Sequence, residues 1–199
     1  MSEALIIIDV QNDFCPGGAL GVPQGDEIVT PVNVLMAAHD GPVIATQDWH
    51  PAGHASFASS HPGKAPFETM TMPYGEQVLW PDHCIIGSPG AAFHDSLDID
   101  RADLIVRKGF RSAIDSYSAF FENDHTTPTG LHGYLQTRGA SRIVLAGLAY
   151  DFCVLYSALD AARLGYRVRV IEDNCRAIDL DGSKAAARQA MQDAGVALV

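Results

Sequence analysis

Three side chains in this sequence have the chemistry to activate a cysteine nucleophile. Asp9 follows an apolar run, where a carboxylate is costly unless it is paired or functional. Lys108 likewise comes after an apolar run, Leu104–Val106. Cys153 stands between an apolar run and a helical pattern, where backbone N–H groups and the helix dipole stabilise a thiolate and can bind an oxyanion. A carboxylate to accept the thiol proton and a cation to balance charge complete the set. The alternatives are a structural Asp9–Lys108 ion pair and a small buried side chain at Cys153.

A second group of residues has the composition of a metal site. Asp48, His50 and His54 lie within seven residues, in a stretch that Pro and Gly keep from forming a helix. His83 lies further along the same irregular region and could complete a site for one divalent cation. The alternative is a set of surface histidines in a polar loop, since the protein has eight.

The apolar runs and helical patterns alternate along the chain. Continuous apolar runs are typical of strands covered on both faces. Six such runs predict strands at Leu5–Ile8, Val43–Thr46, Leu104–Val106, Ile143–Ala146, Tyr166–Ile171 and Val196–Val199. Four amphipathic or helix-forming stretches predict helices at Glu27–His39, Thr129–Arg138, Phe152–Leu164 and Ser183–Ala194. This order predicts an α/β fold, a doubly wound, mostly parallel six-stranded sheet with helices on both faces.

Such a sheet would bring the reactive residues together. Ligands of doubly wound sheets bind beyond the carboxyl ends of the strands, and these ends carry Asp9, Asp48, Lys108 and the turn before Cys153. The region of about residues 48–100 is rich in Pro, Gly and Ser, and a long irregular stretch in a compact domain usually has a function. We therefore expect residues 1–199 to form a single domain with a metal-binding loop region at about 48–100.

Composition and charge limit the partners. The chain is 47% hydrophobic and 19% charged, as in ordinary globular proteins, and its net charge is −11 without a run of Lys or Arg. We therefore expect neither nucleic acid nor a membrane surface as a partner, but a small neutral molecule. The first residues lack the basic region of a signal peptide. The four cysteines form no CxxC pair and are typical of free thiols in a reducing compartment, so we expect a cytoplasmic protein.

The motifs around these residues resemble a known family. Asp9 in IIDVQNDF, Lys108 in KGF and Cys153 in GLAYDFCV are similar to the Asp–Lys–Cys triad of isochorismatase-like cysteine hydrolases. The sequence DWHPAGHASF, which starts at Asp48, and the later WPDHC are similar to the metal set of the nicotinamidases, also called pyrazinamidases. The element order matches that fold over essentially the whole chain.

The resemblance implies a role for each matching residue. Asp9 would be the general base, Lys108 the charge-balancing partner and Cys153 the nucleophile. A non-proline cis peptide would join Leu148 to Ala149, and the N–H groups of Ala149 and Cys153 would bind the amide oxygen. One Zn²⁺, Fe²⁺ or Mn²⁺ ion, and no organic cofactor, would be held by Asp48, His50, His54 and His83. The walls of an aromatic substrate slot would be Phe14, Trp80 and Tyr117, for which core packing is the alternative.

The implied activity is hydrolysis of nicotinamide, and of pyrazinamide, to the acid and ammonia through a Cys153 thioester. Another amidohydrolase of the superfamily, with or without a metal and acting on a ureido or carbamoyl substrate, is one alternative. A metal-water hydrolase in which Cys153 is a bystander is a second, and a non-catalytic metal- or ligand-binding module is a third. The resemblance leaves open the identity of the metal and whether the chain forms a homo-oligomer.

Overall fold

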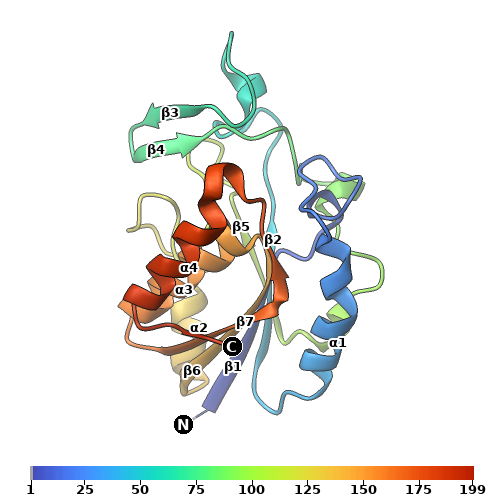
Figure 1. Cartoon of the computed structure of the whole chain (residues 1–199), viewed down its shortest axis with the longest axis vertical. Helices are drawn as coiled ribbons and strands as arrows, with labels where there is room; N and C mark the ends of the chain where they lie inside the picture. Colours follow the sequence, from blue (N-terminus) through green and yellow to red (C-terminus); the bar gives the residue numbers. More distant parts are fainter. Residues whose placement is uncertain (1) are drawn as a thin grey trace.

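A six-stranded parallel sheet forms the centre of the molecule (Figure 1). The computed structural model describes residues 2–199. The strands are β1 (Ser2–Ile8), β2 (Val43–Asp48), β5 (Leu104–Lys108), β6 (Ala140–Leu148), β7 (Arg167–Arg176) and β8 (Ala197–Leu198). Their order is β5-β2-β1-β6-β7-β8, and every neighbouring pair is parallel. The predicted α/β fold with six strands is therefore confirmed.

The strand order reverses between β1 and β6. From β1 the chain moves outward through β2 to β5, then returns to the other side of β1 and continues through β6, β7 and β8. The carboxyl ends of the two strands that flank such a reversal diverge into different connections, which leaves a crevice for ligands. In this chain those ends carry Asp9, after β1, and the segment leading to Cys153, after β6.

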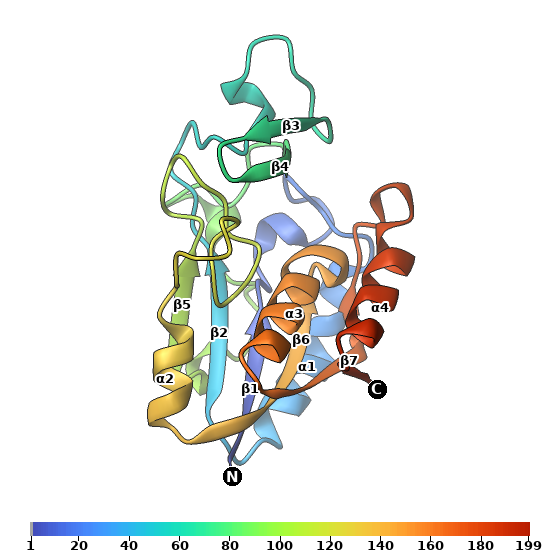
Figure 2. The ribbon, with the colours of Figure 1, turned by 90° about the vertical axis from the view of Figure 1, so that its left-hand side faces the viewer.

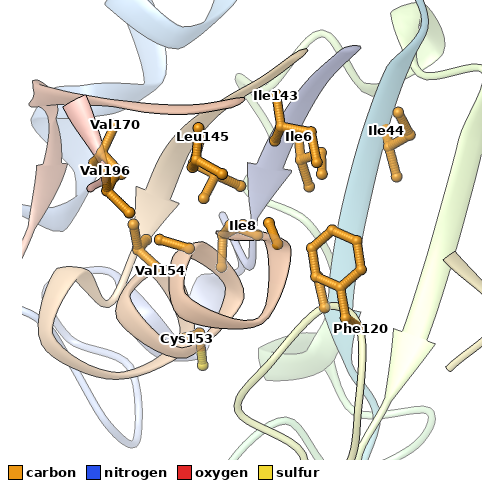
Figure 3. Close-up of a cluster of buried hydrophobic side chains, with 14 of the residues drawn as sticks. Ile6, Ile8, Ile44, Phe120, Ile143, Leu145, Cys153, Val154, Val170 and Val196 are labelled. Atoms are coloured by element: carbon orange, nitrogen blue, oxygen red, sulfur yellow. The ribbon is translucent and has the colours of Figure 1, made fainter. Parts of the chain in front are cut away.

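The helices cover both faces of the sheet (Figure 2). They are α1 (Val29–Ala37), α2 (Leu131–Thr137), α3 (Leu155–Arg163) and α4 (Ser183–Asp193). Apolar residues of α2, α3 and α4 pack with alternate residues of β1, among them Ile6 and Ile8, and Figure 3 shows this cluster with Phe120 and Cys153. The residues between, Leu5 and Ile7, face α1 on the other side. This two-sided burial explains why the strands are continuously apolar.

The start of α3 differs from the sequence-based expectation of a helix from Phe152. Residues Tyr150–Val154 form a π-helical turn, in which the Val154 N–H donates to the Ala149 carbonyl at 3.1 Å, and α3 begins at Leu155. The wider turn carries Cys153 directly after the strand. The expected cis peptide between Leu148 and Ala149 is present.

The region between β2 and β5 also contains regular structure that the sequence did not predict. A two-stranded antiparallel hairpin, β3 (Thr69–Met72) and β4 (Gly75–Val78), projects from the end of the molecule beyond the sheet (Figures 1 and 2). Its strands have four residues each and no apolar run, so they lack the pattern by which strands are recognised. Within residues 2–199, none of the helices combines the length and apolarity required to cross a bilayer.

Candidate active site

A buried lysine lies at the centre of the site. The Lys108 ammonium group ends β5 and is fully buried. It pairs with Asp9 Oδ2 at 2.8 Å and with Asp48 Oδ1, donates to the Ser116 carbonyl at 3.0 Å, and lies 3.4 Å from Cys153 Sγ. One cation thus links three strand ends to the cysteine. The structure brings Asp9, Lys108 and Cys153 together.

Asp9 is held in an unusual backbone conformation beside this lysine. Its φ of 46° lies in the left-handed region, which Asp tolerates better than most residues. The Thr46 hydroxyl donates to Asp9 Oδ1 at 2.7 Å and accepts from the Asp9 N–H at 3.2 Å. Burial raises the pKa of Asp9 to about 6, and the Lys108 ammonium limits the rise. The carboxyl group is therefore largely ionised at neutral pH, with a basicity suited to proton transfer.

The protonation of Cys153 differs from the expectation that the helix start would favour a thiolate. Burial raises the pKa of the Cys153 thiol well above its ordinary value, although the Lys108 ammonium opposes this rise. Cys153 Sγ and a carboxylate oxygen of Asp9 lie within 4.8 Å of each other. The resting pair is therefore a thiol beside a carboxylate, so the thiol proton must be transferred during the attack.

Asp48 is fixed from two sides. Its backbone N–H donates to Gln11 Oε1 at 2.8 Å, and its carbonyl accepts from Gln11 Nε2 at 2.9 Å. Burial alone would raise the pKa of Asp48, but Lys108 and the neighbouring His50 hold it below its ordinary value. The same two carboxylates, of Asp48 and Asp9, keep the pKa of Lys108 well above its usual value despite burial. Asp48 and Lys108 therefore form a charged pair.

The buried side chains of Asp48, His50 and His83 converge beside Lys108, and each has a free electron pair. His50 Nε2 and His83 Nε2 lie 3.7 and 3.8 Å from Asp48 Oδ2, and the potential ligand atoms of the three residues all lie within 4.8 Å of one another. The Nδ1–H groups of His50 and His83 donate to the carbonyl oxygens of Gly109 at 2.9 Å and Pro81 at 2.8 Å. These bonds set the tautomer in which Nε2 carries a lone pair, as in metal-binding histidines.

These residues fit a divalent metal ion. His50 Nε2 is buried and has no hydrogen-bond partner, which is costly unless another group binds it. Burial and the neighbouring His50 lower the pKa of His83 to about 4, which keeps this imidazole neutral. One carboxylate and two imidazoles match the ligand preferences of Zn²⁺ and of similar transition metals.

His54 lies next to this group but does not join it. Its ring centroid is 4.6 Å from that of His50. Its Nε2 faces the carbonyls of Arg111 at 2.9 Å and Ile114 at 3.2 Å, so it must carry the proton. The Nδ1 lone pair then accepts from the hydroxyl of Ser56 at 2.8 Å and from its N–H at 3.1 Å. Because both nitrogens are occupied, this geometry does not support the expectation that His54 is a ligand.

A small cavity of about 20 Å³ opens onto Cys153. The expected wall residues Phe14, Trp80 and Tyr117 all line it, together with Ala149. The Trp80 indole N–H donates to the Tyr117 hydroxyl at 3.0 Å, which fixes both rings. Asp48 and His83 border the same cavity, so the nucleophile and the possible metal site share one space.

Sequence reasoning missed part of this cavity. The lining also contains Leu20, Asp115, Phe152 and Ile178. Phe152 is the exception, because its position directly before Cys153 already predicts a pocket wall, and its ring centroid lies 4.8 Å from that of Trp80 in an edge-to-face contact. Leu20, Ile178 and Asp115 lie in loops and follow no pattern that distinguishes them from other loop residues.

Comparison with known proteins identifies the family. The model of the isochorismatase domain matches residues 3–199. A nicotinamidase of Acinetobacter baylyi is 51% identical over 193 residues, which are 97% of this chain and 90% of that protein. The solved structure of a nicotinamidase/pyrazinamidase from Acinetobacter baumanii is 53% identical, with a TM-score of 0.97 over 99% of this chain and 95% of that one. The pyrazinamidase of Pyrococcus horikoshii in complex with zinc is 32% identical, with a TM-score of 0.80 over 99% and 98%. The chain therefore belongs to the isochorismatase family, in its nicotinamidase/pyrazinamidase group.

Proposed function

We propose that this protein hydrolyses nicotinamide, and also pyrazinamide, to the carboxylic acid and ammonia through a thioester on Cys153. The observation that carries the proposal is the convergence of Asp9, Lys108 and Cys153 beside a cavity that Asp48 and His83 also border. The activities named for the nicotinamidase and pyrazinamidase relatives support this choice of substrate.

The reaction begins when Asp9 accepts the Cys153 proton while sulfur attacks the carboxamide carbon. Lys108 stabilises the charged pair, since it contacts both groups. The amide oxygen becomes an oxyanion, which the backbone N–H groups of Ala149 and Cys153 bind. When the C–N bond breaks, protonated Asp9 gives its proton to the departing ammonia and leaves the thioester.

Water then hydrolyses the thioester. Asp9 accepts a proton from the water as its oxygen attacks the same carbon, and the C–S bond breaks. The proton returns from Asp9 to the Cys153 sulfur, and the acid is released. Asp9 acts as base in both halves of the cycle, and a pKa of about 6 allows it to accept and return the proton near neutral pH.

Asp48, His50 and His83 would hold a divalent metal ion, and the zinc complex of the Pyrococcus horikoshii relative supports this assignment. When bound, the ion supplies a Lewis acid to which the ring nitrogen of the substrate can bind. The aromatic side chains of Phe14, Trp80 and Phe152 would hold the flat ring between them. The four buried, unpaired cysteines support a reducing, cytoplasmic setting, which stays a prediction.

The test is an ammonia-release assay on the purified, metal-loaded protein with nicotinamide as substrate. We expect turnover in the wild type and its loss in Cys153→Ala, whose folding is checked by circular dichroism. Ammonia release by Cys153→Ala at more than a few per cent of the wild-type rate would exclude the thioester. Release from carbamoyl compounds, without release from nicotinamide, would support another amidohydrolase of the superfamily instead.

A further inference from the structure

Asp115 is a buried carboxylate at the edge of the metal site. It lies in the loop that follows β5 and is 2% exposed. The Ser116 N–H donates to its Oδ1 at 2.7 Å, and Gln77 Nε2 donates to its Oδ2 at 3.1 Å. Its Oδ1 also lies 3.9 Å from the unpartnered Nε2 of His50. These contacts fix the carboxylate so that it faces the site.

Within residues 2–199, no Lys or Arg side chain lies within 4 Å of the Asp115 carboxylate. Lys108 is shared by Asp9 and Asp48. In the part of the chain that the structure describes, residues 2–199, the only basic group within 4 Å of the Asp115 carboxylate is the His50 imidazole. The Nε2 atom of this imidazole is buried without a hydrogen-bond partner. A cation bound at this point would be attracted by the carboxylates of Asp48 and Asp115.

The imidazole of His50 therefore stands between two carboxylates. Its Nε2 lies 3.7 Å from Asp48 Oδ2 and 3.9 Å from Asp115 Oδ1. We propose that Asp115 is the fourth side chain of the metal centre, in the place that the sequence suggested for His54. Asp115 is outside the three residues whose atoms converge within 4.8 Å, so it would act on the ion through its charge and not as a direct ligand. This inference rests on the metal site of the proposed function.

Asp115 and His54 make a matched pair for a test. Both are buried beside His50, but only Asp115 directs a charged group toward the ion site, whereas the nitrogens of His54 are bonded to Ser56, Arg111 and Ile114. The substitution Asp115→Asn removes the charge and keeps the shape, including an oxygen that can accept from the Ser116 N–H. The substitution His54→Gln keeps a donor and an acceptor.

The experiment measures Zn²⁺ affinity by chelator competition on metal-stripped protein, without reference to activity. We expect the affinity of Asp115→Asn to fall by about 10–100-fold, the usual effect of removing an outer partner of a metal site, and that of His54→Gln to equal the wild type. Metal-free Asp115→Asn should remain folded, as checked by circular dichroism. Its melting temperature should rise less than that of the wild type when Zn²⁺ is added.

Equal Zn²⁺ affinity in Asp115→Asn and wild type would overturn the role of Asp115 while leaving the metal site itself intact. A greater loss of affinity in His54→Gln, folded by circular dichroism, than in Asp115→Asn would also overturn it. Asp115→Ser provides a second uncharged variant, so the result does not depend on the folding of one protein. Failure of the wild type to bind any divalent ion would instead refute the metal site of the proposed function.

Discussion

Replacing Gly109 by alanine should displace His50 from the metal site. Gly109 has a φ of 68°, and a Cβ built on it would lie 2.4 Å from Cε1 and 2.7 Å from Nδ1 of the His50 ring. Carbon atoms in contact stay about 3.5 Å apart, so the ring must move by about 1 Å. The movement would strain or break the bond from His50 Nδ1–H to the Gly109 carbonyl, which orients Nε2.

The expected loss of unfolding free energy in Gly109→Ala has two parts. A residue with a side chain costs about 1–2 kcal/mol in the left-handed region, and overpacking adds about 1–3 kcal/mol. Gly53→Ala is the matched control, because Gly53, in the loop after β2, has a φ of 73° but no atom within 4 Å of its added Cβ. We expect Gly53→Ala to lower the free energy of unfolding by about 1–2 kcal/mol. Gly109→Ala should lower it by about 2–5 kcal/mol, the sum of the two parts.

The assays are urea unfolding of the metal-free proteins and chelator competition for Zn²⁺. Gly109→Ala should bind the ion at least about 10-fold more weakly than wild type, as when a partner that orients a ligand is lost. Gly53→Ala should bind it as the wild type does. Equal Zn²⁺ affinities for the two variants would refute the role of the Gly109–His50 contact.

Three further predictions concern the chemistry. Asp9→Asn should lower kcat by about 10²–10⁴ with little change in KM, because the base is lost while the shape is kept; equal losses in binding and turnover would indicate a structural role instead. Iodoacetamide should label Cys153 before the three other buried cysteines, since Cys153 lines the cavity, and nicotinamide should protect it; mass spectrometry of the labelled peptides would reveal any other order. Benzamide, which lacks the ring nitrogen, should be a much poorer substrate than nicotinamide, and metal removal should weaken nicotinamide binding far more than benzamide binding; equal kcat/KM for the two amides would rule out the ring-nitrogen anchor.

The sequence by itself determined the order of the elements and the residues at the strand ends. The six apolar runs correspond to β1, β2, β5, β6, β7 and β8. Their continuity reflects burial on both faces, which is a local property of each strand and can be read without knowing its neighbours. Asp9 and Lys108 were found for the same reason, because each interrupts a run at its end. The convergence of these ends follows from parallel strand direction alone.

The tertiary structure decided which of the candidate residues act together. The tautomer of His54 depends on the carbonyls of Arg111 and Ile114, which lie 57 and 60 residues away along the chain. The place of Asp115 beside His50 depends likewise on the path of the loop after β5. The π-helical turn before α3 and the β3–β4 hairpin also escaped the sequence, because neither has a periodic apolar pattern. Whether a buried nitrogen is free to bind a metal depends on which distant groups donate to it or accept from it, and local sequence does not encode those partners.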